Sequence, residues 1–246
     1  MREELKKVTA SLRSVAIVAD KKGETVENSI KNAGSTSSSR IFFVHDWVEG
    51  TGNIGEICLS PFVAGLIAKT DSELGFWSSP SNREFNGIKR ILNPRTWSMG
   101  DKDSEVNRLN EFGVASIIRE GGFRLWGART LGKNDLVEDA HKFLNVRRIT
   151  DTISDTIDNS MLWAVDKNIG KAYVEQVNEA IDNYLRSLRQ DGAIINGKVW
   201  ASEDNTPADI ESGKIKFCFD YTPTYPAEQV KIEQIITNKY VGEIFK

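Results

Sequence analysis

Few residues in this 246-residue chain combine the types and spacing that chemistry requires. His45 and His141 are the only histidines, and His45 precedes Asp46, so the two neighbours resemble half of a catalytic or metal-binding set. A histidine beside the end of an apolar strand more often serves structure, and we favour that interpretation. The sequence also lacks the HExxH, CxxC and GxSxG patterns that metal binding and nucleophilic hydrolysis use.

The glycines of residues 121–127 are the second chemical candidate, because a Gly-rich loop can hold phosphate. Such a loop would indicate an α/β ligand-binding domain or a nucleotide-dependent enzyme. The segment lacks the Gly-Lys-Ser/Thr ending, and Phe123 to Trp126 alternates like a strand. We therefore expect a hairpin around Gly121-Gly122 and no cofactor.

Two groups of charged residues lie at helical spacing. Asp151, Asp155 and Asp158 could hold a cation or do acid–base work, but a solvated face with Arg147 pairing to Asp151 is the simpler interpretation. A second stripe has acid toward its N-terminal end and arginine toward its C-terminal end, which suits the helix dipole. It is either a plain exposed face or a docking face for another protein, and consists of Glu175, Glu179, Asp182, Arg186 and Arg189.

Composition excludes several classes of protein. The net charge of −3 gives no sign of a surface for nucleic acid or anionic membranes. No apolar run approaches the roughly 20 residues of a membrane-spanning helix, and the charged N-terminus does not resemble a signal peptide. Cys58 and Cys218 suit two reduced thiols in a cytoplasmic protein better than a disulfide.

The first part of the chain alternates between helix and strand patterns. We expect a Gly-rich connection from Gly50 to Gly55, and elements at 1–13, 15–19, 24–32, 41–44 and 61–74. Strands that are apolar throughout and separated by helices predict a parallel sheet covered on both faces. Residues 1–98 are therefore expected to form a small α/β domain.

Residues 99–246 are expected to form an α+β domain. It should contain a short helix at 104–112, a hairpin of strands 114–118 and 123–126, and two long helices whose apolar stripes span 143–157 and 174–188. A turn at Asn196-Gly197, an alternating strand near 214–221 and a last strand at 230–236 complete a mixed sheet with a terminal strand arm.

The order of several motifs resembles that of contractile tail sheath proteins of myophages and R-type pyocins. Leu109–Val114 is followed by Gly121–Thr130, then by Asn145–Arg148 and Trp163–Val165. The residues that carry this resemblance are Phe123, Arg124, Trp126, Gly127, Arg129, Asn145, Arg147 and Arg148.

The resemblance implies a structural protein and not an enzyme. Sheath subunits stack as six-fold rings around a tail tube, and contraction of this homopolymer drives the tube through a cell envelope without nucleotide. The implied partners are other copies of the chain, the tail tube protein, and the baseplate and tail terminator proteins, without nucleic acid or membrane. The implied location is a virion tail or phage-tail-like particle, made in bacterial cytoplasm.

The resemblance also assigns regions. Residues 1–98 correspond to the outer or middle part of the sheath protein, and residues 99–246 to the C-terminal domain that faces the tube. The 175–189 stripe becomes the candidate tube-facing helix. The interface is a terminal arm that adds a strand to an adjacent subunit, and its residues are Val230, Ile232, Gln234, Ile235 and Ile236.

One departure from the family is visible. Sheath proteins of this kind begin well upstream, so the chain is expected to be a C-terminal fragment without the N-terminal arm, and to stay monomeric alone. Two other classes remain open besides the sheath. A nucleotide-binding enzyme domain would explain the first 98 residues, and an adhesin or receptor-binding module would explain the strands and aromatic residues.

Overall fold

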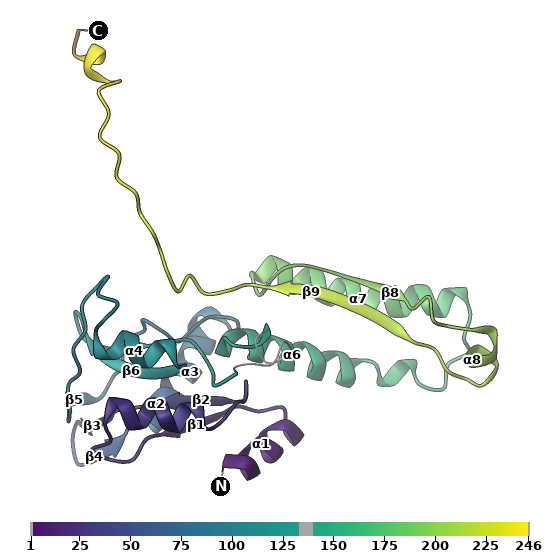
Figure 1. The fold of residues 1–246 in the computed structure, drawn as a ribbon. Helices are drawn as coiled ribbons and strands as arrows, with labels where there is room; N and C mark the ends of the chain where they lie inside the picture. The colour runs from purple at the N-terminus through teal and green to yellow at the C-terminus, as the bar shows by residue number, and fades with distance from the viewer. Residues whose placement is uncertain (1, 133–139, 246) are drawn as a thin grey trace.

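A four-stranded sheet forms the centre of the first half of the molecule (Figure 1). The computed structural model describes residues 2–132 and 140–245. Strand β2 pairs in parallel with β1 and β6, and β7 is antiparallel to β6, which confirms the parallel pairing and the hairpin expected from the sequence. The order is β1 (Ala16–Ala19), β2 (Ile41–Val44), β6 (Val114–Arg119) and β7 (Phe123–Trp126).

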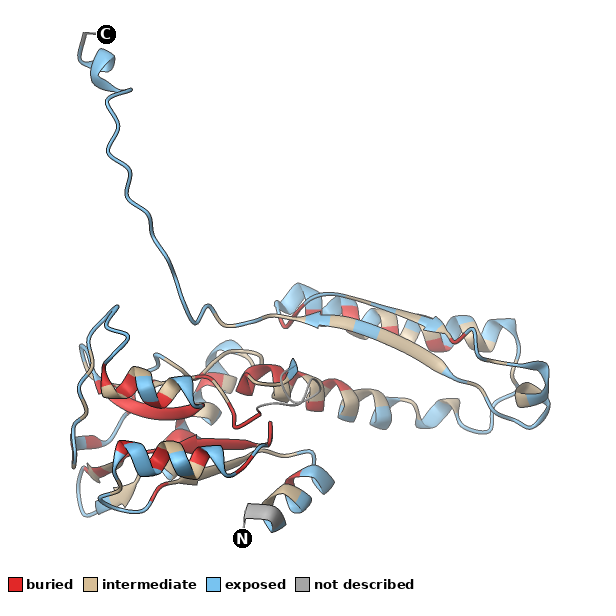
Figure 2. Ribbon diagram, viewed as in Figure 1, coloured by how far each residue is buried: buried red, intermediate tan, exposed pale blue. Residues whose placement is uncertain are grey.

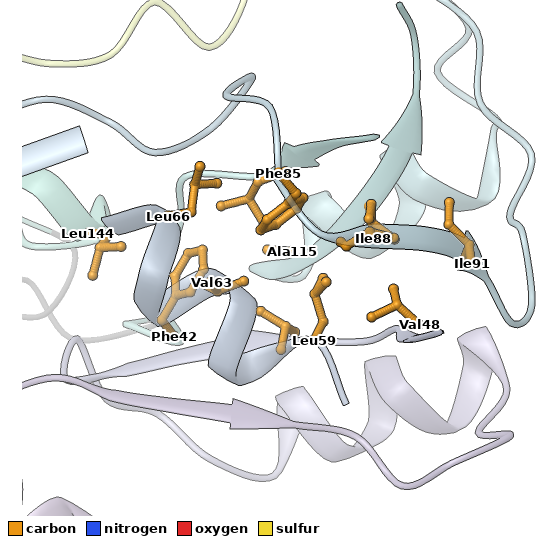
Figure 3. Close-up of a cluster of buried hydrophobic side chains, with 13 residues drawn as sticks. Phe42, Val48, Leu59, Val63, Leu66, Phe85, Ile88, Ile91, Ala115 and Leu144 are labelled. Atoms are coloured by element: carbon orange, nitrogen blue, oxygen red, sulfur yellow. The ribbon is translucent and has the colours of Figure 1, made fainter. Parts of the chain in front are cut away.

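Helices cover both faces of this sheet, as fully apolar strands predict. All four residues of β2 are buried; Ile41 and Phe43 pack in one cluster, and Phe42 and Val44 in another. Helices α2 (Val26–Gly34) and α4 (Glu105–Glu111) cover the first face. Helix α3 (Ser60–Leu74) covers the second, where its Val63 and Leu66 surround Phe42 (Figure 3).

A second small sheet was not expected from the sequence. The segment that we expected to be a Gly-rich connection is an antiparallel hairpin, with positive φ at Gly52 in its turn and at Gly55, where β4 begins. The sequence signal was weak because each strand has four residues, without clear alternation. The order is β4 (Gly55–Cys58), β3 (Trp47–Gly50) and β5 (Ile88–Ile91), and Val48, Ile88 and Ile91 join the core with Phe42.

The four-stranded sheet combines strands from both sides of residue 98. Strand β6 lies beside β2 because its five buried residues, Val114 to Ile118, complete the centre of the sheet. The expected division at residue 98 therefore falls between two strands of the same sheet.

The second half of the molecule is long and narrow (Figure 1). Helices α6 and α7 pack their apolar stripes together, with Ile149 and Ile153 of α6 against Ile181 and Leu185 of α7. Helix α7 ends at Asp191, and Gly192, with a φ of 84°, forms its left-handed cap. The elements are α6 (Leu144–Ser160), η1 (Leu162–Ala164), α7 (Lys171–Asp191), β8 (Ile194–Ala201), α8 (Pro207–Glu211), β9 (Phe217–Pro223) and η2 (Val241–Phe245), and at the opposite end of the chain α1 (Arg2–Ser11).

Strands β8 and β9 form a two-stranded antiparallel ribbon, which corrects the expected mixed sheet and the turn at Asn196-Gly197. Both residues lie inside β8, opposite Thr222 and Tyr221 of β9. A Cβ on Gly197 would lie 2.8 Å from the Asp220 carbonyl oxygen, so glycine here allows close approach of two strands. The connection between the strands is longer and contains α8.

The expected strand at residues 230–236 is wrong for the isolated chain. After Pro223 the chain runs away from the body as an extended segment, which we call the arm (residues 224–245), and residues 230–236 pair with no strand (Figure 1). An extended segment becomes a strand only through a hydrogen-bonding partner. The described part of the chain offers none within reach.

Candidate assembly interface

The arm is the most exposed apolar segment of the chain (Figure 2). Val230 is 73% exposed, Ile232 89%, Ile235 74% and Ile236 90%, and Gln234 is exposed among them. In an extended chain alternate residues share a face, so Val230, Ile232, Gln234 and Ile236 lie on one side. Large apolar side chains at this exposure usually mark an interaction site.

The ribbon presents the complementary kind of surface. Its inward side chains Val199, Phe217, Phe219 and Tyr221 pack on the helices, and the Tyr221 hydroxyl donates to Thr150 Oγ1 at 2.9 Å. Burial raises the pKa of Tyr221, so its hydroxyl keeps that proton. Among the described residues no further strand pairs with β8 or β9, so each strand has one open edge. Open edges accept strands from other chains.

The residues that begin the arm are held firmly. Thr224 donates from its backbone N–H to the Ala193 carbonyl at 3.2 Å, and its hydroxyl donates to the carbonyls of Gly192 and Ala193, each at 3.1 Å. The Asn145 amide donates to the Thr224 carbonyl at 3.1 Å. Because Asn145 is 3% exposed, this end of the arm is fixed to the buried start of α6.

A second contact holds the arm four residues further on. Arg129 donates from Nε to Glu228 Oε1 at 2.7 Å and to Oε2 at 3.0 Å, and also from Nη2 to Oε2. The Arg129 guanidinium lies 5.9 Å from the centroid of the Phe143 ring, and that ring packs edge-on against Tyr225 at 6.3 Å. Sequence reasoning missed Thr224, Tyr225 and Glu228, since no spacing signal links them to Arg129.

Arg148 and Asn145 of the sheath-like motif connect α6 to other segments, whereas Arg147 pairs within the helix. Arg148 donates to both carboxylate oxygens of Asp71, at the C-terminal end of α3, and to the Phe76 carbonyl at 3.4 Å. Arg147 pairs with Asp151 at 2.7 Å, as the spacing predicts. Asn145 also donates to the Trp77 carbonyl at 3.1 Å. These contacts fix α6 against the end of α3.

The remaining motif residues shape the hairpin. Arg124 donates to the carbonyls of Glu120 and Asn82, each at 2.9 Å, and Phe123 packs against the central core. Trp126 packs edge-on against Trp97, with ring centroids 5.2 Å apart. Gly127 has a φ of 129°, and a Cβ there would lie 2.5 Å from the Asn110 amide. This motif therefore serves packing and arm anchoring.

The acidic face of α6 is not simply solvated, which corrects the expectation for Asp151. Asp151 is 7% exposed and accepts from Arg40 Nη1 and Nη2, each at 2.8 Å, in addition to Arg147. Arg13 reaches Asp155 at 2.8 Å and Asp158 at 2.6 Å, and both carboxylates remain half exposed. Arginines from the first half of the chain thus neutralise this helix.

The charged stripe of α7 lies on its exposed side. Glu175, Glu179, Arg186 and Arg189 are exposed, and Asp182 is half-buried. Lys171 pairs with Glu175 at 3.8 Å and Arg186 pairs with Asp182, both at i,i+4 spacing. These pairs are exposed and contribute little to stability, so the stripe is available to another molecule.

The chemical candidates serve structure. His45 Nδ1 lies 3.0 Å from Asp20 Oδ2, while Asp46 accepts from Ser116 Oγ at 2.6 Å and from the Ile117 N–H at 2.9 Å. His45 is 3% exposed and Asp46 4%, and this burial favours a structural role for both. Across the described ranges, no group of three or more potential ligands is placed to hold a metal.

The Gly121-Gly122 turn is also poorly suited to phosphate. The Glu84 carboxylate occupies the space that a Cβ on Gly122 would need. A carboxylate there repels an anion.

A groove of about 960 Å³ opens beside the beginning of the arm. Trp97, Met99 and Trp126 line one side, and residues 224–231 of the arm line the other. Both cysteines are free thiols, as expected.

Comparisons with known proteins agree with this architecture. The model of the phage tail sheath protein central domain matches residues 1–131, and the model of the phage tail sheath C-terminal domain matches residues 137–237. A putative prophage major tail sheath protein of Pseudomonas aeruginosa (strain UCBPP-PA14) is 35% identical over 95% of this chain and 60% of its own length. The tail sheath protein of Escherichia phage P2 is 34% identical over 73% of this chain and 45% of its own length.

Solved structures share the fold. The sheath complex of an extracellular contractile injection system, PVC, in the contracted state matches with a TM-score of 0.77 at 21% identity, over 91% of this chain and 64% of that one. The contracted helical sheath of the anti-feeding prophage matches with a TM-score of 0.74 at 22% identity, over 95% of this chain and 66% of that one.

The two family models together match residues 1–131 and 137–237. This chain belongs to the phage tail sheath protein family. It spans 60% or less of the length of the two relatives described above. Within the described ranges, every helix is too short or too polar to cross a bilayer.

Proposed function

We propose that the chain is a structural subunit of a contractile tail sheath. It polymerises as hexameric rings around a tail tube, and contraction of the polymer drives the tube through a cell envelope. The observation that carries this proposal is that the same chain has both an exposed apolar arm and a ribbon with two open edges. Neither feature is satisfied within one copy of the described chain.

Addition of the arm to the ribbon of a second copy would satisfy both. The arm would gain main-chain hydrogen bonds, and Val230, Ile232 and Ile236 would continue the apolar face that Val199 and Phe219 present to the helices. Burying one isoleucine side chain contributes about 2 kcal/mol. Three such side chains would stabilise the pairing by roughly 6 kcal/mol, before the cost of ordering the arm.

The charged side of α7 is the proposed contact with the tail tube. Along the stripe Glu175, Glu179 and Asp182 precede Arg186 and Arg189, so its acidic residues lie toward the N-terminal end of α7 and its arginines toward the C-terminal end. Replacing Arg186 and Arg189 with glutamate should weaken binding to the tube and reduce the salt dependence of that binding. The pairing of the arm with another copy should stay unchanged. Equal binding by the variant would remove α7 from the tube interface.

The proposal extends to location and domains. The remaining partners are baseplate and tail terminator proteins, and the particle is a virion tail or phage-tail-like particle made in bacterial cytoplasm. We place the α/β unit, the outer or middle part of the sheath, before residue 132, where the central-domain match ends, and the tube-facing unit after residue 136. Strand β6, which completes the first sheet, supports this placement over a division at residue 98.

Photo-crosslinking tests the arm pairing. A benzoylphenylalanine at Glu233, on the opposite side from Ile232, should crosslink to an edge residue of β8 or β9 in another copy. Mixing isotope-labelled and unlabelled chains separates crosslinks between copies from those within one. Crosslinks found only within one copy, or only between two arms, would overturn the proposed pairing.

Electron microscopy tests the polymer. The chain alone and the chain joined to the unmatched part of the Pseudomonas relative should be compared after purification. Rings or striated tubes from the joined protein would support the sheath function. Dispersed particles in both samples would contradict it.

A further inference from the structure

Two residues of the sheath-like motif, Arg129 and Asn145, contact the first residues of the arm. Thr224 is half-buried and is held by hydrogen bonds to the buried residues Ala193 and Asn145, whereas Glu228 is held by an ion pair whose side chains are 38% and 31% exposed. We call these contacts the arm-root clasp, which consists of Arg129, Phe143, Asn145, Thr224, Tyr225 and Glu228.

The two anchors differ in strength for a physical reason. Releasing Thr224 would leave the carbonyl of the buried Ala193 without two donors, the N–H and the hydroxyl of Thr224, and the buried Asn145 amide without one acceptor. A buried polar group without a partner is costly. Releasing Glu228 only returns two partly exposed charges to water, which costs little.

Beyond Glu228 the arm has no recorded hydrogen bond or ion pair to the body, within the ranges that the structure describes. The direction in which the arm leaves is therefore set between residues 224 and 228. Pro226 restricts the backbone in this interval, and the Glu228 N–H bonds to the Pro226 carbonyl at 2.9 Å.

We propose that the Arg129–Glu228 pair is a releasable latch and that Thr224 is the pivot about which the arm turns. When the Arg129–Glu228 pair is formed, the arm leaves the body in one direction. When the pair is broken, the arm changes direction while Thr224 stays in place. The purpose of the latch rests on the proposed sheath function. A subunit could then rotate while its arm stays paired with a neighbour.

Arg129 is the positioning residue of this device. Its guanidinium binds both carboxylate oxygens of Glu228 while it lies over Phe143, and Phe143 in turn packs on Tyr225. Lysine cannot make this paired, stacked contact. Loss of an exposed ion pair of this kind should raise the ratio of released to latched arms by about fivefold.

Spin-label distance measurements test the latch. Nitroxides placed by Lys69→Cys on α3 and Gln229→Cys just after the latch, with Cys58 and Cys218 replaced by serine, report arm direction. Position 229 is chosen because residues further along are free to move in either state. With the latch unaltered, the distances between the two nitroxides should form one narrow distribution. This distribution should broaden as ionic strength rises from about 0.01 M to about 1 M.

Matched variants give the decisive comparison. Arg129→Gln should broaden the distance distribution, and the swapped pair Arg129→Glu with Glu228→Arg should narrow it again. Arg119→Gln, at the exposed end of β6, removes the same charge elsewhere and should change nothing. A distribution that Arg129→Gln leaves unchanged, or that the swap fails to narrow, overturns the latch.

The measurement is made within one copy of the chain. A negative result in the spin-label measurement would contradict the latch and would leave the proposed pairing of arms between copies untouched. The photo-crosslinking experiment can fail without affecting the latch.

Discussion

Removing the Asp151 carboxylate should destabilise the chain more than removing its neighbours on α6. This carboxylate accepts three hydrogen bonds, two from Arg40 and one from Arg147. Its side chain is 9% exposed, and those of Arg40 and Arg147 are 15% and 12% exposed. Asp151→Ala would leave two nearly buried guanidinium groups without a counter-charge.

The magnitude follows from the burial. Breaking a buried ion pair by removing one partner costs about 3–5 kcal/mol. That is a large part of a total stability of about 5–15 kcal/mol. With a urea dependence of about 3 kcal/mol per molar, the midpoint of urea unfolding should fall by about 1–2 M.

Urea titration followed by tryptophan fluorescence and circular dichroism measures the change. Asp158→Ala is the matched control: its side chain is 61% exposed, it pairs with Arg13, and its loss should cost less than about 1 kcal/mol. Equal midpoint shifts for the two variants would refute the argument that burial of Asp151 makes the difference. Asp151→Asn should fall between them, since it retains shape and loses charge.

Three further predictions concern the arm, the hairpin and pH. Ile232→Asp should reduce crosslinking between copies by about 30-fold or more, whereas Ile235→Asp, on the opposite side of the arm, should reduce it less. Gly127→Ala should lower the free energy of unfolding by about 1–3 kcal/mol, because a Cβ meets Asn110 at a positive φ. Gly65→Ala, in open space on α3, should raise it by about 0.5–1 kcal/mol, and thermal unfolding compares the two. Burial raises the pKa of Asp46, so the folded chain holds that proton more tightly than the unfolded chain. The free energy of unfolding therefore falls as pH rises above the pKa that Asp46 has in the unfolded chain. In urea titrations from about pH 4 to about pH 7, the stability of Asp46→Asn should rise relative to that of the unaltered chain.

The sequence predicts the elements better than their partners. Helical stripes such as Ile149–Ile153 and the fully apolar strand Ile41–Val44 identify elements because one local period decides each. The strands around Gly52 were missed because Trp47–Gly50 and Gly55–Cys58 mix glycine and glutamate with apolar residues, whereas Ile41–Val44 is apolar throughout. Gly197 was taken for a turn because a glycine needed for close strand approach looks the same in sequence.

The candidate site shows the same limit. The sequence identifies residues 230–236 as apolar and alternating, but pairing depends on a surface that only folding, or a second copy, supplies. Asp151 was expected in solvent because helical spacing revealed Arg147 and could not reveal Arg40, 111 residues earlier. Long-range contacts of this kind have no local signal.

The arm-root clasp and the ion pairs of Asp151 with Arg40 and Arg147, which we call the Asp151 network, suggest an order in which contacts break when a subunit is pulled by its arm. Force on the arm reaches Thr224, then Asn145 at the start of α6, then Asp151 and Arg40, which precedes the central strand β2. Exposed charges separate most easily and buried ones least, so the latch should open first and the Asp151 network last. Raising salt should therefore broaden the arm distances while the urea midpoint barely changes. If the arm distances broaden and the urea midpoint falls over the same range of salt, the latch and the Asp151 network open together, and the arm and the body move as one unit.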